Sequence, residues 1–399
     1  MWSLVSGQSV SLLGDYLAFF FALPVLVRDL TGSAAQLGLL AVAETAAVLA
    51  FGLLAGVLLD RVRIRWAIVF ADLARAAAFA LLAVAVVADA ARPWMAFGVA
   101  FIVGSMGTIF DAGLEGIMPS ALPSDALITA NSLLQTGRNL AMTLGFVIGG
   151  LAVAGFGGVA GAFAFNSTSY LVSVVAVLLV REIRPRPRAP AEPIGTSLTT
   201  GLRFLWDSVP LRWATGISAL TNAAFAPLAA VMTLYADVEL GIESEVLLGL
   251  FFAGFSLVGA AGVFFAPVLV RIFGLGPAMA IGAAAFGTGA VVVGMANGWW
   301  AVAPLGVAAA GVATSQVAFM TLRQQLTPRH MAGRVIAASR TAAWAGIPAG
   351  AALGGWIADT VGLRPLFIGG GVIIVWSAVA IILGPLGRLR KAEPASEAA

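Results

Sequence analysis

The sequence contains no cysteine and a single histidine among its 399 residues. Without cysteine the chain can form no disulfide, no thiolate metal site and no haem attachment, and one histidine leaves little room for histidine-based catalysis. Charge is also scarce, because Asp, Glu, Lys and Arg make up 10% of the chain, whereas soluble domains carry roughly 25%. We therefore expect no cofactor, no metal and no enzymatic activity.

What the sequence has in abundance is apolar residues, which make up 60% of the chain. A water-soluble fold of this length cannot cover its surface with so few charges, whereas lipid-facing helices need none. Apolar runs long enough to cross a bilayer, about 20 residues, recur along the whole chain. They predict an all-α polytopic membrane protein with twelve transmembrane helices. The predicted spans are 4–28, 33–59, 67–89, 93–119, 127–155, 158–181, 209–236, 245–270, 276–297, 299–322, 332–359 and 363–386.

The basic residues indicate an orientation. Sixteen of the 22 lie in the connections on one side of the predicted spans, and only three lie on the other side. Basic loops stay in the cytoplasm, so we expect both termini there and the protein in the cell (inner or plasma) membrane. The first apolar run is too long for a signal peptide and is taken as a retained span. The net charge of +3 is attributed to topology and anionic lipid rather than to nucleic acid.

The chain divides into two halves. Residues 182–208 contain an Arg-Pro-Arg-Pro-Arg run and predict a cytoplasmic linker, with a short surface helix around 197–206. The linker separates an N-terminal six-helix half, 1–181, from a C-terminal half, 209–387, which is followed by a cytoplasmic tail, 388–399. A glycine pattern recurs between the halves at an offset of 205 residues. Such a parallel repeat predicts pseudo-two-fold symmetry about an axis along the membrane normal, with a binding site between the halves.

Three sequence features resemble the major facilitator superfamily. The run from Gly56 to Arg61 with Arg63 resembles its G-x-x-x-D-R loop signature, although Arg63 stands where the family usually has glycine. Gly145, Gly149 and Gly150 are similar to the glycine motif of its drug exporters, with phenylalanine in place of the family's proline. The N-terminal run around Asp15 and the segment 72–75 resemble the branch of macrolide-efflux and siderophore-export proteins. The resemblance implies the major facilitator fold over essentially the whole chain.

Ionisable residues inside spans cost roughly 2.5–3.5 kcal/mol to insert, so each is a functional hypothesis. At 1.5 Å rise per residue, Asp15 and Arg138 lie about 16 Å, and Asp111 about 12 Å, from the cytoplasmic ends of their spans. A low dielectric favours the neutral carboxyl and a nearby arginine favours the carboxylate. We predict Asp15 or Asp111 as the proton carrier, with Arg138 as partner and Glu44 in reserve. The alternative is a static pair of Asp111 and Arg138 that only fixes helix packing.

The remaining candidates fall into three groups. Charged and small residues at the cytoplasmic ends of spans 2 to 4 predict a gate: Gly56, Asp60, Arg61, Arg63, Asp72, Arg75 and Glu115. Repeated glycines predict close helix packing, or an interface that rocks: Gly145, Gly149, Gly150, Gly350, Gly354 and Gly355. Polar and aromatic residues of the second half predict a substrate cavity: Asn222, Phe225, Phe251, Phe252, Gln316 and Trp344.

The sequence therefore predicts a secondary active transporter that exports a small amphipathic organic compound, such as a drug, macrolide or siderophore, in exchange for protons. Its expected partners are the small-molecule substrate, protons and the lipid bilayer, with no nucleic acid, and the expected state is a monomer. No phosphate-binding glycine loop is present to use ATP. The alternatives are a proton-coupled importer of a small solute with the same fold, and a non-transporting membrane sensor.

Overall fold

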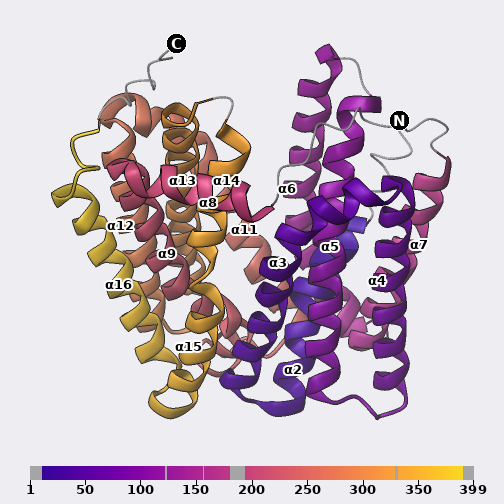
Figure 1. Cartoon of the computed structure of the whole chain (residues 1–399). Helices are drawn as coiled ribbons and strands as arrows, with labels where there is room; N and C mark the ends of the chain where they lie inside the picture. Colours follow the sequence, from indigo (N-terminus) through magenta and orange to yellow (C-terminus); the bar gives the residue numbers. More distant parts are fainter. Residues whose placement is uncertain (1–10, 122–123, 156, 180–193, 329–330, 390–399) are drawn as a thin grey trace. The chain divides into compact units, whose positions relative to one another are not determined.

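In the computed structural model, the described part of the chain is built from helices and their connections (Figure 1). The structure describes residues 11–121, 124–155, 157–179, 194–328 and 331–389. Inside these ranges it does not describe the side chains of residues 53–58, 60–61, 114–121, 124–136, 139, 194–198 and 332–333.

The helices follow one another in the order that the twelve predicted spans require. Those of the first six spans are η1 (Asp15–Ala22) with α2 (Leu23–Thr31), α3 (Ala34–Arg61), α4 (Ile64–Val87), α5 (Pro93–Ala121), α6 (Ser124–Gly155) and α7 (Gly158–Leu179). Helix α8 (Ile194–Asp207) lies in the stretch predicted as a linker, where the sequence indicated a short helix. The remaining helices are α9 (Val209–Ala230), α10 (Met232–Val238), α11 (Glu245–Phe273), α12 (Leu275–Met295), η2 (Gly298–Ala301), α13 (Val302–Leu326), α14 (Ala332–Trp344), α15 (Ile347–Val361) and α16 (Leu363–Leu383).

Nine helical segments of the described chain are long and apolar enough to cross a membrane, and the bent pair α9–α10 makes a tenth. The two other predicted spans correspond to α6, whose described apolar stretch is Leu140–Gly155, and to the pair α14 and α15. The sequence prediction of an all-helical membrane protein is confirmed.

Two of the predicted spans are broken, and a proline lies near each break. Helices α9 and α10 meet at 48° just after Pro227, and α14 ends three residues before Ile347, which precedes Pro348 at the start of α15. Proline has no N–H for the helix ladder, and its ring clashes with the carbonyl four residues earlier. The predicted spans 209–236 and 332–359 are therefore each made of two helices.

The first span also departs from a regular α-helix. Its first eight described helical residues after Gly14, Asp15–Ala22, form the π-helix η1, and Pro24 follows at the start of α2. A π-helix has a wider turn than an α-helix and is found mostly in short pieces, often at functional sites. The irregular stretch therefore marks the neighbourhood of Asp15 as a place to look for function.

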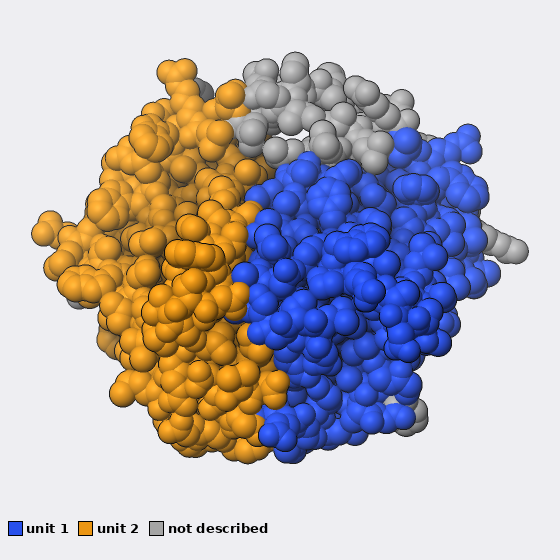
Figure 2. Space-filling model, turned by 90° about the horizontal axis from the view of Figure 1, so that it is seen from below, with its two compact units in different colours: residues 1–191, 242–253 blue, residues 192–241, 254–399 orange. Residues whose placement is uncertain are grey.

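The chain forms two compact units, coloured separately in Figure 2. Unit 1 contains residues 1–191 and 242–253, and unit 2 contains residues 192–241 and 254–399. In unit 1, α4 packs against α5 and α7, and η1 packs against α6 and α7. The start of α11 belongs to this unit because Glu245 pairs with Arg28 of α2, and Phe252 stacks on Phe146 of α6 with ring centroids 5.3 Å apart.

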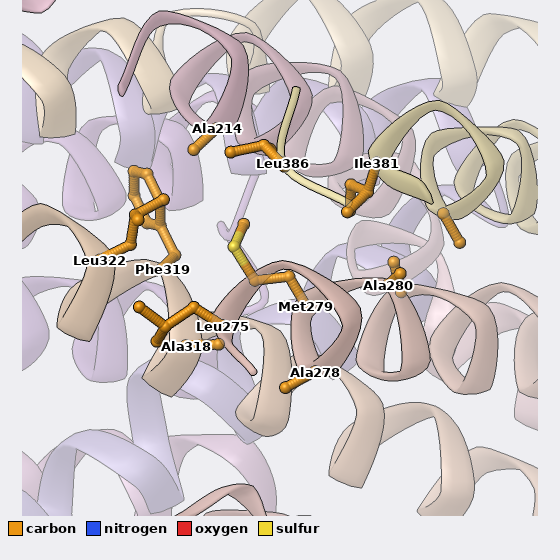
Figure 3. Close-up of a cluster of buried hydrophobic side chains, with 12 residues drawn as sticks. Ala214, Leu275, Ala278, Met279, Ala280, Ala318, Phe319, Leu322, Ile381 and Leu386 are labelled. Atoms are coloured by element: carbon orange, nitrogen blue, oxygen red, sulfur yellow. The ribbon is translucent and has the colours of Figure 1, made fainter. Parts of the chain in front are cut away.

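Unit 2 is organised around α12, which packs against both α13 and α16, while α15 packs against α9. A cluster of buried apolar side chains fills the space among four of these helices (Figure 3). Met279 of α12 lies close to its centre, with Phe319 and Leu322 of α13 on one side and Ile381 of α16 on the other. Alanines supply much of the cluster, so the helices approach closely.

The repeated glycines lie where helices touch. In unit 1, a Cβ added at Gly145 would come within 2.5 Å of Tyr16 Cβ, and one at Gly149 would lie 3.1 Å from the Phe21 ring. A Cβ at Gly150 would lie 2.4 Å from the carbonyl oxygen of Glu245. Gly145 and Gly149 thus let α6 approach η1, and Gly150 lets it approach the start of α11.

The second copy of the pattern does the same in unit 2. A Cβ at Gly350 would lie 2.1 Å from the carbonyl oxygen of Ala223, and one at Gly354 would lie 2.0 Å from Pro227 Cβ. Ala223 is the residue whose carbonyl Pro227 cannot bond, because proline has no N–H. Gly350 leaves room for that carbonyl at the surface of α9. Gly355 is buried on the same helix.

Candidate functional site

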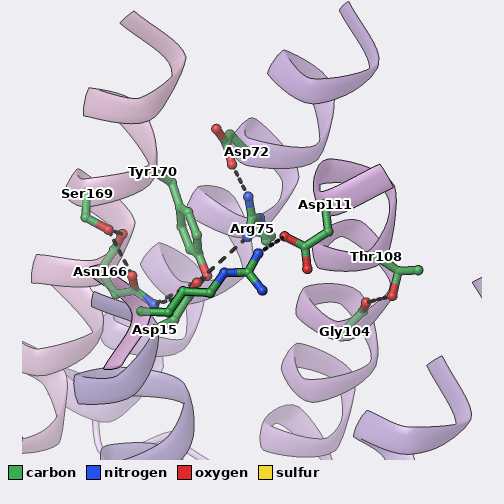
Figure 4. Close-up of polar contacts among 10 residues, drawn as sticks. Asp15, Asp72, Arg75, Gly104, Thr108, Asp111, Asn166, Ser169 and Tyr170 are labelled. Atoms are coloured by element: carbon green, nitrogen blue, oxygen red, sulfur yellow. Dashed lines mark hydrogen bonds and ion pairs between the residues drawn. The ribbon is translucent and has the colours of Figure 1, made fainter. Parts of the chain in front are cut away.

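The most heavily charged buried place in the described chain lies inside unit 1, among η1, α4 and α7. Asp15 is the first residue of η1, and Asp72 and Arg75 lie one turn apart on α4. Their side chains point toward Tyr170 of α7 (Figure 4). Asp72 is fully buried and Arg75 is 4% exposed. Because an unpaired buried charge costs several kcal/mol, such groups are expected to be paired.

Arg75 connects the two carboxylates. One of its terminal nitrogens, Nη2, donates to Asp72 Oδ1, and the other, Nη1, lies 4.0 Å from Asp15 Oδ2. The guanidinium carbon also lies 4.4 Å from the ring centre of Tyr170 and 4.6 Å from that of Phe110 on α5. A cation placed over aromatic rings gains attraction from their quadrupoles, more so when it is desolvated. The arginine is therefore held between two rings with a carboxylate near each arm.

Asp15 has two neutral partners on α7. The Tyr170 hydroxyl donates to Asp15 Oδ1, and Asn166 Nδ2 lies 3.4 Å from the same oxygen. Ser169 Oγ donates to Asn166 Oδ1 at 2.9 Å, which fixes the amide with its nitrogen toward Asp15. A Cβ at Gly14 would lie 2.3 Å from Asn166 Oδ1, so glycine at this position admits the amide. The carboxyl of Asp15 is thus set in a polar cage made by another helix.

The sequence analysis predicted Asp15 as a site residue but did not predict its partners on α7. Asn166, Ser169, Tyr170 and Ser173 recur at i, i+3, i+4 and i+7, which is one stripe of a helix. A polar stripe in an otherwise apolar span is the signal that could have indicated a buried polar face on α7. Asp72 and Arg75, which the sequence assigned to a gate, lie in the cluster with Asp15.

The other predicted proton carriers lie outside this cluster. Asp111 of α5 pairs with Arg138 of α6, with Nη2 and Oδ1 3.3 Å apart and side chains 53% and 41% exposed. The dashed line at Asp111 in Figure 4 marks this ion pair. Glu44 is half-buried on α3. The predicted pairing of Arg138 is thus with Asp111 rather than with Asp15, and the roles of these residues stay predictions.

Most of the predicted gate falls outside what the structure describes. Arg63 is exposed just before α4. Gly56 and the residues Asp60, Arg61 and Glu115 lie in the backbones of α3 and α5, and the structure does not describe the surroundings of Gly56 or the three side chains.

A second feature is a pocket inside unit 2, between α9, α12, α13 and α16. The space inside it, with its open mouth included, is about 490 Å³. The sequence-predicted cavity residues Asn222, Phe225 and Gln316 line it. It is also lined by the phenyl rings of Phe286 and Phe319. All the described residues that line this pocket are uncharged.

The polar groups of the pocket differ in what they already bind. Asn222 Nδ2 donates to the carbonyl of Ala343 at 3.0 Å, and Ser315 Oγ donates to that of Met279 at 3.0 Å. Gln316 is exposed toward the pocket, and within the described residues its amide has no hydrogen-bond partner. The pocket therefore combines an aromatic surface with the amide of Gln316, which can both donate and accept a hydrogen bond to a ligand.

The other predicted cavity residues do not line this pocket. Phe251 and Phe252 belong to unit 1, where Phe252 packs edge-on against Phe21 with ring centroids 6.3 Å apart. Trp344 of α14 lies under the guanidinium of Arg340, whose carbon is 4.6 Å from the ring centre. Phe251, Phe252 and Trp344 therefore do not line this pocket, and their role in a substrate cavity stays a prediction.

Comparison with known proteins agrees with this architecture. The profile of the Major Facilitator Superfamily matches residues 4–351. The multidrug efflux pump Tap of Mycolicibacterium fortuitum is 26% identical over 390 residues, which cover 94% of this chain and 93% of Tap. The enterobactin exporter EntS of Salmonella typhi is 28% identical over 416 aligned residues, covering 99% of this chain and 93% of EntS.

Solved structures show the same fold at low sequence identity. A point mutant of the nucleoside transporter NupG has a TM-score of 0.79 and 13% identity, covering 96% of this chain and 98% of NupG. An inward-facing, occupied bacterial homologue of the lysosomal transporter Spinster has a TM-score of 0.77 and 14% identity, covering 98% of each chain. With the family profile matching most of the chain, this protein belongs to the Major Facilitator Superfamily.

Proposed function

We propose that this protein exports a small amphipathic organic compound, such as a drug, macrolide or siderophore, in exchange for protons. The observation that carries the proposal is that the charged cluster and the uncharged pocket lie in different units. Unit 1 contains the buried carboxylate of Asp72 and the partly buried carboxylate of Asp15 beside an arginine, and unit 2 contains an aromatic pocket lined by uncharged side chains. The relatives Tap and EntS, named as a multidrug pump and an enterobactin exporter, support export over import.

In this mechanism Asp15 carries the proton. Its carboxyl is held by Tyr170 and Asn166 and lies near Arg75. Protonation of Asp15 therefore changes the net charge of the cluster that it forms with Asp72 and Arg75. Ionisable groups inside spans mark proton relays in pumps and transporters. The substrate binds with its apolar part on the aromatic surface of unit 2, and alternating movement of the halves carries it outward. No ATP is needed, because the proton gradient drives the exchange.

Proton flux in proteoliposomes tests this proposal. Purified protein is reconstituted, and external pH is followed after addition of erythromycin, enterobactin or ethidium. We expect each transported compound to move protons in the opposite direction. Asp15→Asn should lower substrate-dependent proton flux by about tenfold or more, since the amide cannot exchange a proton.

The matched control is Asp89→Asn. Asp89 is exposed in the turn after α4 and has a left-handed backbone (φ 51°), which asparagine tolerates. This variant should keep the wild-type flux. Loss of flux in Asp111→Asn with Asp15→Asn unaffected would move the proton site to the exposed pair. Inside-out vesicles with an acidic lumen give the direction, because an antiporter would take up the compound and a symporter would expel it.

The pocket of unit 2 makes a separate prediction. Gln316→Ala removes an amide whose hydrogen bond to a substrate would contribute about 0.5–1.5 kcal/mol. We expect KM for the transported compound to rise about three- to tenfold with little change in the maximal rate. Thr288→Ala is the control, because this exposed hydroxyl of α12 donates to Ala284 of its own helix at 2.7 Å. An equal KM in the Gln316 variant and wild type would remove the pocket from the substrate's path.

The proposal includes a topology. The excess of basic residues on one side supports both termini in the cytoplasm and insertion in the cell membrane. We also expect a monomer. Reporter fusions at either end, active only in the cytoplasm, and the mass of the purified protein in detergent test these two points.

A further inference from the structure

We propose that Asp15, Asp72 and Arg75 together hold one exchangeable proton, so that Asp72 is a second proton-holding carboxylate and Arg75 passes between the two. This rests on the proposed function only for its use in transport, because the proton count is a property of the cluster itself.

Two carboxylates and one guanidinium give a net charge of −1 when no proton is bound. The charged groups that act electrostatically on Asp15 are Arg75 and Asp72, and the one that acts on Asp72 is Arg75. Tyr170 faces them from α7 as a neutral phenol, and Phe110 faces them from α5 as an apolar ring. Nearby Asp111 pairs with an arginine of α6, and the two add no net charge.

A buried charge without a counter-charge is costly, and the usual response is to bind or lose a proton. Arginine keeps its proton in proteins, so the proton must come to a carboxylate. With one bound proton the cluster is neutral. With no bound proton one carboxylate has no counter-charge, and with two bound protons the guanidinium has none. Burial therefore selects a single proton for the three groups.

The geometry lets either carboxylate hold that proton. With Arg75 bonded to Asp72, as found here, the proton belongs on Asp15, whose Oδ2 is 4.0 Å from the nearest guanidinium nitrogen. The guanidinium lies between two rings, which attract it without fixing its position along their faces. The Nε of Arg75 has no hydrogen-bond partner within the described residues. This N–H can therefore donate to Asp15 if the guanidinium moves toward it.

The exchange conserves protons and charge. When Asp15 loses its O–H proton to a water molecule of the aqueous side, Arg75 turns toward the new Asp15 carboxylate. Asp72 then lacks its counter-charge and takes a proton from water, which restores neutrality. The cluster releases one proton at one carboxylate and binds one at the other, and no other group changes its state.

Infrared spectroscopy of the substrate-free protein tests the count. A protonated carboxyl has a C=O stretch above the amide region, and its integrated band reports how many are present. We expect one such group from the cluster in wild type and none in either Asp15→Asn or Asp72→Asn, because each variant leaves one carboxylate for one arginine. Arg75→Gln should contain two. Glu44 lies outside the cluster, so any band it gives stays constant across the series.

Two double variants make the test specific to charge. Asp15→Asn/Arg75→Gln and Asp72→Asn/Arg75→Gln each contain a lone carboxylate, so the single protonated group should return in both. Asp89→Asn should leave the wild-type band unchanged. A structural defect in a single variant would not be repaired by removing a further side chain.

Three results would overturn the proposal. They are an unchanged band in Asp72→Asn, the same band in Arg75→Gln as in wild type, and no return of the band in the double variants. Because no substrate is present, these results are independent of whether the protein exports anything. Conversely, a cluster that behaves as expected in a protein that moves no protons with any compound would contradict the proposed function alone.

Discussion

Replacing Arg75 by glutamine is expected to lower the free energy of unfolding by about 3–5 kcal/mol, the usual cost of removing one partner from a buried ion pair. Arg75 is 4% exposed and its partner Asp72 is fully buried, so water cannot take the place of the guanidinium. The substitution also removes a cation held between the rings of Phe110 and Tyr170. Thermal unfolding in detergent, followed by intrinsic fluorescence, measures the loss.

The control for this prediction is a double variant in which Asp72, the ion-pair partner of Arg75, is also replaced by a neutral residue. Asp72→Asn/Arg75→Gln removes both charges of the pair and loses the same guanidinium packing as Arg75→Gln. We expect the double variant to be more stable than Arg75→Gln, because only one carboxyl, that of Asp15, has to be kept protonated near neutral pH instead of two. If both variants unfold at the same temperature, the cost lies in lost packing around the guanidinium and not in the charge.

Gly350→Ala is expected to destabilise unit 2 by about 3 kcal/mol, toward the upper end of what overpacking costs. The added Cβ would lie 2.1 Å from the carbonyl oxygen of Ala223. A flexible side chain could turn away, but a backbone carbonyl can move only if α9 or α15 moves. The same thermal unfolding measurement, together with the yield of monodisperse protein, checks the prediction.

Gly369→Ala provides the matched comparison in the same unit. Gly369 lies inside α16, and a Cβ there would meet no atom within 4 Å. Because alanine favours a helix interior over glycine by up to about 1 kcal/mol, this variant should be as stable as wild type or more stable. A Gly350→Ala protein that unfolds together with Gly369→Ala would show that α15 and α9 are not in the contact described.

Much of the fold could be predicted from particular stretches of sequence. The apolar runs indicated the helices and their order, and the interval of 205 residues indicated the correspondence between Gly145, Gly149 and Gly350, Gly354. Both copies lie against the first span of their own unit. The breaks near Pro227 and Pro348 were not predicted, although the prolines are visible, because apolar composition continues through both.

The candidate site was predicted in part. Asp15 was singled out because a carboxylate in an apolar span is costly, and that reason does not depend on its neighbours. Most of its partners were not predicted. Arg138 was expected as the partner of Asp15 or Asp111, and it pairs with Asp111, while Tyr170 and Asn166 were not considered, because neutral polar residues carry a smaller insertion cost.

The sequence by itself determined that the chain is a polytopic helical membrane protein and which ionisable residues its apolar helices contain. These follow from hydrophobicity and from the fixed rise of a helix, which are properties of one segment at a time. Only the tertiary structure decided which side chains meet. Successive residues turn by about 100° around a helix, so the face that Asp15 or Arg75 presents depends on how neighbouring helices pack. That packing is set by glycines, alanines and prolines of other segments, and it brought Arg75 to Asp15.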